Sequence, residues 1–252
     1  MRFQSPLVPA RLLRRYKRFL ADVRLESDGR EVTVHCPNPG AMTGLDRPGM
    51  RVWLEPARGK GRKLPFGWRL VELGGGHLAG IDTQVPNRVV AEALADGRIP
   101  ALLGHDEIRR EVRLGDQSRI DFLLCDGRGG RTWVEVKNVH LRREGPVAEF
   151  PDCVTKRGAR HLDELARVAR SGARAVLLFV VQRSDCRAVR VAGDIDPAYL
   201  RAFEAARDAG VEVVCHETEL STTEIRLGGS LPLLAPVRPA GSDGLAHDDT
   251  SP

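Results

Sequence analysis

Short runs of alternating apolar and polar residues fill the first third of the chain, and turn-forming clusters such as SDGRE and CPNPG separate them. Alternation with a period of two is typical of half-buried β-strands. We therefore expect six short strands, at about 6–13, 18–26, 31–36, 50–56, 65–74 and 78–82. So many strands without a long helical pattern favour a small closed or partly closed β-barrel, a class that includes the OB-fold.

The pattern changes at residue 84, where VPNRVVAEALADGRIP introduces a helical periodicity. Asn87 is the expected N-cap of this helix, and Gly97 and Pro100 are expected to follow its end. Downstream we expect strands at about 106–114, 118–125, 131–140, 173–182 and 211–216, helices at 153–170 and 197–209, and an edge strand in EIRLGGSLPLL. This order predicts a mixed sheet with helices, in a second domain.

The predicted fold class is mixed α and β: an OB-like β-barrel over 1–83, then an α/β domain with a mixed sheet over 84–234. The last segment, 235–252, is rich in proline and in small and polar residues. Such a composition buries too little apolar surface to fold, so we expect a disordered tail.

Composition sets limits on the function. The net charge of +5 is mild for 252 residues, so the placement of basic side chains matters more than their total. The five cysteines form no CxxC pair, which disfavours disulfides and zinc and favours the cytoplasm. No signal peptide, membrane-spanning stretch, phosphate-binding glycine loop or serine elbow is visible.

The hairpin SRIDFLLCDGRGGRTWVEVKNV contains the most informative polar residues. Glu135 and Lys137 alternate with core positions on the second strand, and Asp121 does so on the first. If the glycine-rich turn is centred on Arg128, Asp121 lies opposite Glu135, and Arg119 lies opposite Lys137. Two opposed carboxylates repel each other, so a cation is expected beside them.

A divalent cation, Mg²⁺ or Mn²⁺, would cancel this repulsion, with Asp121 and Glu135 as its ligands. Lys137 would hold or deprotonate an attacking water, or neutralise charge that develops on a phosphate. These groups are the parts of a phosphodiesterase site. The alternative is a solvated ion pair on an exposed strand, because E-x-K triplets are common.

The hairpin resembles the core of PD-(D/E)xK nucleases. Together with HCPNPGAM, PNRVVAEAL, SRIDFLL, VEVKNV and FPDCVTKRGARHLDEL, it is similar to the sugar fermentation stimulation protein family from about residue 2 to 233. The resemblance implies DNA binding by an OB-fold domain joined to a nuclease-like domain. It also implies catalytic and metal roles for Asp121, Glu135 and Lys137. Glu92 matches the helix position where many such nucleases supply another acid.

Basic side chains form two further clusters, which are candidates for nucleic-acid binding. RLLRRYKRF mixes cations with aromatic residues, a combination suited to phosphates and exposed bases, and ARGKGRK forms a basic loop. The candidates are Arg14, Arg15, Lys17, Arg18, Lys60 and Lys63. Alternation allows only half of a strand's side chains to line one groove, and an Arg-rich solvated surface is the alternative.

The helix TKRGARHLDELARVAR adds three candidate phosphate contacts, Lys156, Arg157 and His161. They would lie beside the hairpin if this helix packs on the sheet as it does in nucleases. A lone histidine on a helix is more often structural. Gly158 indicates either close approach of a ligand or close packing of the helix on the sheet.

The main hypothesis is therefore a cytoplasmic, DNA-binding protein with a metal-dependent phosphodiesterase site. A second hypothesis keeps the fold without the chemistry: a DNA-binding regulator of sugar-metabolism genes on a nuclease-like core. A third is an RNA enzyme or RNA binder, because OB-like barrels can bind strands of either DNA or RNA. The sequence leaves the oligomeric state open.

Overall fold

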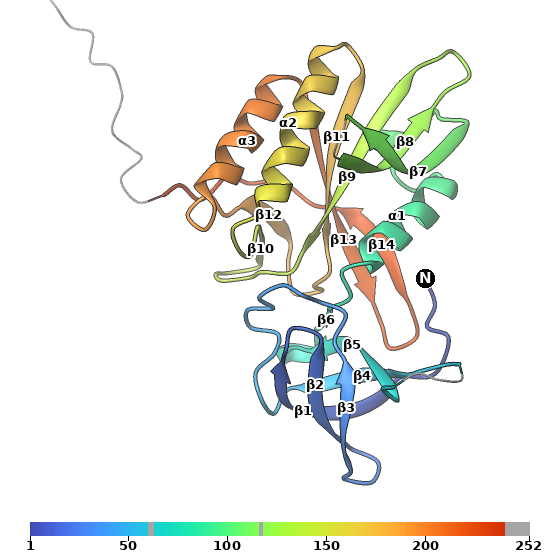
Figure 1. Ribbon diagram of the computed structural model, residues 1–252, viewed down its shortest axis with the longest axis vertical. Helices are drawn as coiled ribbons and strands as arrows, with labels where there is room; N and C mark the ends of the chain where they lie inside the picture. The colour runs from blue at the N-terminus through green and yellow to red at the C-terminus, as the bar shows by residue number, and fades with distance from the viewer. Residues whose placement is uncertain (60–62, 116–117, 240–252) are drawn as a thin grey trace, which may run out of the picture.

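The computed structural model describes residues 1–59, 63–115 and 118–239. These residues form a small β-barrel and a larger α/β part, which are stacked on each other with β6 between them (Figure 1). None of the helices in the described ranges is both long and apolar enough to cross a membrane.

The barrel strands are β1 (Val8–Tyr16), β2 (Leu20–Leu25), β3 (Glu31–His35), β4 (Arg51–Pro56), β5 (Phe66–Glu72) and β6 (Leu78–Gly80), with a 3-10 turn at Gly74–Gly76. Their order is β3-β2-β1-β4-β5-β6, and β3 also pairs with β5, so that five strands close on themselves. Leu12, Val23, Leu54 and Trp68 fill the interior without exposure to solvent. The six expected strands and the OB-like barrel are confirmed.

The α/β part contains the strands β7 (Glu107–Leu114), β8 (Ser118–Cys125), β9 (Arg131–Val139), β11 (Arg174–Val181), β13 (Glu212–Leu220) and β14 (Ile225–Ser230). The sheet order is β14-β13-β11-β9-β8-β7. The neighbours β9, β11 and β13 are parallel, and the other pairs are antiparallel. The predicted mixed sheet with β14 at its edge is confirmed.

Helices cover both faces of this sheet (Figure 1). They are α1 (Val85–Ala95), α2 (Lys156–Arg170) and α3 (Pro197–Asp208), with a 3-10 turn at Pro100–Leu102. One core cluster joins α2 and α3 to the sheet through Leu162, Leu165 and Phe203. The other joins α1 through Val89 and Val90. The continuous apolar run of β11 follows from this arrangement, because a central parallel strand is buried on both faces.

Three details differ from the sequence expectations. Asn87 is not the N-cap of α1, because the helix already begins at Val85 after Gln84. The helix expected from residue 153 begins at Lys156, where the Thr155 hydroxyl accepts a hydrogen bond from the Gly158 amide. A separate parallel pair, β10 (Val147–Phe150) and β12 (Ala188–Val191), was not expected.

The beginning of the expected tail extends the fold along β12. The Val237 amide donates to the Val191 carbonyl at 2.8 Å, and Arg238 forms an ion pair with Glu204. Residues 235–239 are therefore held by the α/β part. The remainder of the expected tail, 240–252, lies outside the described residues.

The barrel and the α/β part meet at β6. The Gly80 amide donates to the Gln182 carbonyl at 3.0 Å, and Leu78 and Ser184 exchange two hydrogen bonds. A Cβ at Gly80 would lie 2.6 Å from Oε1 of Gln182. Glycine at this position therefore lets the two backbones approach closely, directly before α1 begins.

Candidate functional site

The β8–β9 hairpin has the predicted register at its turn. Phe122 pairs with Val134, and the ladder continues to Cys125 and Arg131. Asp126 closes the turn by accepting hydrogen bonds from two backbone amides, and Gly129 adopts a φ of 88° that favours glycine.

The β8–β9 ladder ends at Phe122 and Val134, so it includes neither the expected pair of Asp121 with Glu135 nor that of Arg119 with Lys137, and this part of the register prediction is wrong. On its other edge, β8 continues to pair with β7 as far as Ser118. The reason is a change of face along β8: Phe122 packs in the core cluster of α1, whereas Ile120 packs in the cluster of α2. Asp121 lies between them, where β8 separates from β9.

The Asp121 carboxylate bridges the gap that this separation leaves. Its Oδ2 accepts a hydrogen bond from the Val136 amide at 2.8 Å, and its Oδ1 accepts one from Nδ2 of Asn87 at 2.6 Å. Burial and then repulsion from Glu135 raise the pKa of Asp121 to about 6, against the opposing effects of both hydrogen bonds and Lys137. The expected electrostatic conflict between Asp121 and Glu135 is therefore present.

Glu135 is the most deeply buried acid of this cluster, with 4% of its side chain exposed. Its Oε1 contacts both the Lys137 ammonium and Nδ1 of His161, whereas its buried Oε2 has no hydrogen-bond partner among the described residues. Burial alone would raise the pKa of Glu135, but Lys137 and His161 hold it below its usual range. Lys137 and His161 thus hold one oxygen, and burial leaves the other uncompensated.

His161 reaches Glu135 from α2 and belongs to the interior of the cluster. Its Nε2 accepts a hydrogen bond from Nε of Arg157 at 3.3 Å, which leaves Nδ1 as the donor toward Glu135. Only 3% of His161 is exposed. In this arrangement His161 orients Glu135, and the predicted direct contact with nucleic acid is not supported by its position. Arg157 and Lys156 are exposed at the start of α2.

Gly158 allows close packing at this end of α2. A Cβ at this position would lie 2.9 Å from the Thr155 side chain and 3.2 Å from Tyr199. Tyr199 is fully buried, and its hydroxyl has no hydrogen-bond partner in the part of the chain that the structure describes. Burial, followed by the charges of Glu135 and Asp196, raises its pKa well above the usual value. Nothing in the sequence pattern had indicated Tyr199, because an aromatic residue on an amphipathic helix is usually a core residue.

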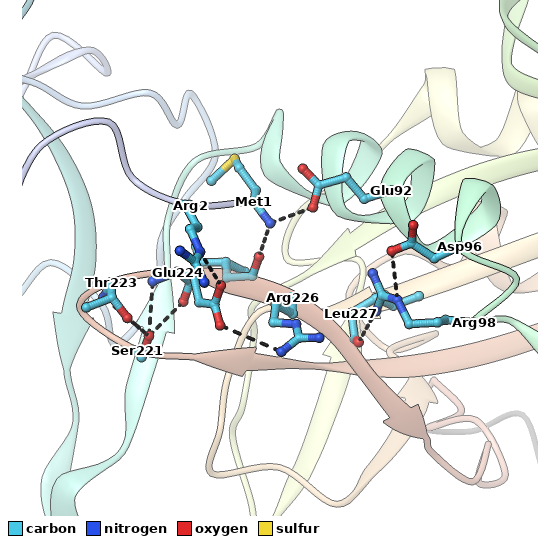
Figure 2. Close-up of polar contacts among 11 residues, drawn as sticks. Met1, Arg2, Glu92, Asp96, Arg98, Ser221, Thr223, Glu224, Arg226 and Leu227 are labelled. Atoms are coloured by element: carbon cyan, nitrogen blue, oxygen red, sulfur yellow. Dashed lines mark hydrogen bonds and ion pairs between the residues drawn. The ribbon is translucent and has the colours of Figure 1, made fainter.

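Glu92 lies away from the cluster, contrary to the prediction that it supports the metal. Its carboxylate accepts a hydrogen bond from the Met1 ammonium, beside the start of β14 (Figure 2). Five residues on a helix correspond to 140° beyond a full turn, so Asn87 and Glu92 cannot share a face of α1. Asn87, which the sequence indicated as a cap, contacts Asp121 instead.

The basic residues of the β1–β2 turn have different roles. Arg15 is 11% exposed and donates to the carbonyls of Asn38 and Gly40, so it holds the loop after β3 and is not free for DNA. Arg14 is 70% exposed and pairs with Asp22. Lys17 and Arg18 form the exposed tip of the turn, in left-handed backbone conformations.

The basic loop between β4 and β5 is described only in part, and Lys60 lies outside the described residues. Lys63 is exposed. Arg58 donates to the Ser5 hydroxyl and the Gln4 carbonyl, so it supports the N-terminal segment.

The structure thus brings together Asp121, Glu135 and Lys137, with His161 and Asn87 as supports. Among the described residues, no group of three or more histidine, cysteine, aspartate or glutamate side chains is arranged to hold a metal ion. Any cation at this cluster would therefore take its protein side-chain ligands from two carboxylates and the rest from water, backbone or substrate.

Comparisons with known proteins identify both parts of the chain. The model of the SfsA N-terminal OB domain matches residues 13–81, and that of the sugar fermentation stimulation protein RE domain matches residues 84–224. A sugar fermentation stimulation protein homolog of Jannaschia sp. is 62% identical over 92% of this chain and 97% of its own. One from Dinoroseobacter shibae is 58% identical, over 92% and 96%.

A solved structure has the same fold over nearly the full length. It is Pyrococcus furiosus SfsA in complex with Ca²⁺, which is 32% identical and superposes with a TM-score of 0.81, over 93% of this chain and 99% of its own.

Proposed function

The chain belongs to the sugar fermentation stimulation protein family, and we propose that it is a DNA-binding phosphodiesterase that requires a divalent cation, Mg²⁺ or Mn²⁺. The observation that carries this proposal is the closeness of the Asp121 and Glu135 carboxylates, which repel each other beside Lys137, together with Oε2 of Glu135, which is buried without a hydrogen-bond partner among the described residues. A buried carboxylate oxygen without a donor is costly, and a cation would compensate it.

The donor set fits a hard divalent cation. Mg²⁺ is usually bound through one or two carboxylates and keeps several waters or substrate oxygens, and Asp121 and Glu135 supply such a pair. The solved relative is a complex with Ca²⁺, which also prefers oxygen ligands. Because Asp121 and Glu135 repel each other, a cation between them would also lower the pKa of Asp121 below its present value of about 6.

When bound, such a cation would polarise the phosphoryl oxygen and lower the pKa of a coordinated water. The protein side chains have separate tasks. Asn87 and the Val136 amide fix the Asp121 carboxylate. Glu135 uses its Oε1 to hold the Lys137 ammonium, which is then positioned to orient the attacking water or to neutralise charge on the phosphate.

His161 and Arg157 complete the support of this cluster. His161 donates to Glu135, and Arg157 donates to His161. The guanidinium of Arg157, at the start of α2, is therefore linked to the Glu135 carboxylate through His161. Lys156 extends the positive charge at the surface. With Lys17 and Arg18 on the barrel, these residues are the proposed contacts to the phosphates of DNA.

A second candidate function is a DNA-binding regulator of sugar-metabolism genes without nuclease activity. The contacts of Glu135 favour it, because the Lys137 ammonium and His161 already compensate one oxygen of this carboxylate. Both candidates share DNA binding and differ in chemistry at the cluster.

Calorimetric titration of the EDTA-treated protein with MnCl₂, combined with cleavage assays on duplex DNA, single-stranded DNA and RNA, tests the proposal. The wild type should bind Mn²⁺ and cleave DNA. Asp121→Asn should lose both properties and keep DNA affinity measured in EDTA. If the folded wild-type protein binds DNA but neither binds Mn²⁺ nor cleaves DNA, the proposed phosphodiesterase activity is refuted and the proposed regulator is supported.

A further inference from the structure

A hollow of about 540 Å³ lies between the barrel, the N-terminal segment and the first turn of α1. We call it the cationic hollow and define it by Arg58, Lys63 and Arg88, with the aromatic rings of Phe3 and Phe66. Its volume is that of a site for a small molecule. It can admit one unstacked nucleotide and not a double helix.

The described residues do not neutralise the charge of the cationic hollow. Arg58 donates to Gln4 and Ser5, Arg88 donates to Gln84, and Lys63 has no hydrogen-bond or ion-pair partner among the described residues. None of these three cations contacts a carboxylate in the described structure.

The acid in the lining is already paired. The carboxylate of Glu55 binds Arg69, which also binds Asp82. Three cations therefore remain available to an anionic ligand.

The walls of the cationic hollow are fixed. The Met1 ammonium contacts Glu92 and the Ile225 carbonyl, and Arg2 contacts Glu224, so the N-terminal segment is fastened to α1 and to the β13–β14 hairpin (Figure 2). The Phe3 amide donates to the Thr223 carbonyl at 3.1 Å. A preformed wall lowers the entropic cost of binding a ligand.

The cationic hollow is also adjacent to the candidate catalytic cluster. Asn87 and Arg88 are consecutive residues in the first turn of α1, and their side chains diverge by about 100°. Asn87 contacts Asp121, whereas Arg88 lines the cationic hollow. A nucleic-acid strand with a phosphate at Asp121 could therefore continue into the cationic hollow on the neighbouring face of α1.

We propose that the cationic hollow binds the backbone of single-stranded DNA next to the phosphate at the Asp121 cluster, so that the protein prefers a single strand over duplex DNA. Lys63 and Arg88 contact phosphates, and Phe3 and Phe66 face the bases or sugars. This inference rests on the DNA binding proposed above and not on the chemistry of cleavage.

The test compares the double variant Lys63→Ala/Arg88→Ala with Arg201→Ala, an exposed arginine of α3. Arg58 is left intact because it supports the N-terminal segment. Fluorescence anisotropy in EDTA measures the affinity for a labelled single strand and for the duplex of the same sequence, from about 0.05 to 0.2 M salt. Circular dichroism checks that each variant melts like the wild type.

The affinity of the double variant for the single strand should be about tenfold lower at 0.15 M salt. The plot of the logarithm of the association constant against the logarithm of salt concentration should become less steep by about 1.4. The slope changes by about 0.7 for each phosphate that the protein no longer neutralises. Duplex binding should change by less than about twofold, as should both affinities of the Arg201→Ala control. Lys63→Ala alone, which does not alter α1, should show about half of the change in slope.

The proposal is overturned if the double variant binds the single strand like the control, or if duplex binding falls equally. Because no metal is present, loss or retention of cleavage does not affect this result. A wild-type protein that binds neither strand would overturn both this inference and the DNA binding on which it rests.

Discussion

Replacing Asp121 with asparagine should stabilise the protein in the absence of metal, although it removes a proposed metal ligand. The pKa of Asp121 is about 6, against an ordinary value of 3.8. Each unit of pKa corresponds to about 1.4 kcal/mol, so the ionised carboxylate destabilises the fold by about 3 kcal/mol above pH 6. Asparagine has nearly the same shape and no charge.

The hydrogen bonds of Asp121 can survive this substitution. An asparagine oxygen can still accept from the Val136 amide, and its amide group can donate to Asn87 if the Asn87 side-chain amide turns by 180°. The expected gain therefore reflects mainly the removal of charge.

The pH dependence has a definite direction. Because the pKa of Asp121 is raised in the folded state, the folded protein binds more protons than the unfolded chain between about pH 4 and 6. The wild type therefore loses stability as the pH rises through this window, and Asp121→Asn does not. The advantage of the variant should grow from about 1 kcal/mol at pH 4.5 to about 3 kcal/mol at pH 8.

Urea unfolding in EDTA, followed by circular dichroism, measures this difference as a shift in midpoint of about 1 M or more at pH 8. Asp208→Asn, at an exposed carboxylate near the end of α3, is the control and should change stability by about 0.5 kcal/mol or less. Added Mn²⁺ should stabilise the wild type and have little effect on Asp121→Asn. This reasoning would be refuted if Asp121→Asn were less stable than the wild type at pH 8 in EDTA. It would also be refuted if the urea midpoints of the two proteins differed by the same amount at pH 4.5 and at pH 8.

Three further substitutions test the assignments of individual residues. Asn87→Ala should weaken Mn²⁺ binding about tenfold in calorimetry, because it removes the donor that fixes Asp121, and unchanged affinity would exclude this role. Arg15→Ala should lower the free energy of unfolding by about 2 kcal/mol because its hydrogen bonds to the loop after β3 are removed, and a drop in DNA affinity without a change in stability would contradict that assignment. Glu92→Gln should leave the cleavage rate unchanged, and loss of cleavage would show that Glu92 acts at the catalytic cluster.

Much of the candidate site follows from strand periodicity alone. Glu135 and Lys137 have the same parity on β9, and the contacts of both with His161 confirm that they share a face. The glycine turn also sets the register of the hairpin near its tip. Both features are local, so they can be predicted without knowledge of the rest of the fold.

The errors concern contacts between distant segments and one helix. The N-cap of α1 is Gln84, three residues before the expected Asn87. The role expected for Glu92 came from the family resemblance, but Asn87 and Glu92 lie on different faces of α1, and it is Asn87 that contacts Asp121. The carbonyls that bind Arg15 are 23 and 25 residues away in the chain. The β10–β12 pair consists of four-residue strands far apart in sequence, too short for a periodic signal.

Cleavage of DNA by Lys137→Ala tests the central claim most directly, because this change removes the ammonium group and leaves Asp121 and Glu135 in place. Arg201→Ala, which removes an exposed cation from α3, is the control. With Mn²⁺ at saturating concentration, Lys137→Ala should cleave at least about 100-fold more slowly than the wild type while it still binds Mn²⁺ and DNA, and Arg201→Ala should keep the wild-type rate. Cleavage by Lys137→Ala at the wild-type rate would contradict the assignment of chemistry to this cluster.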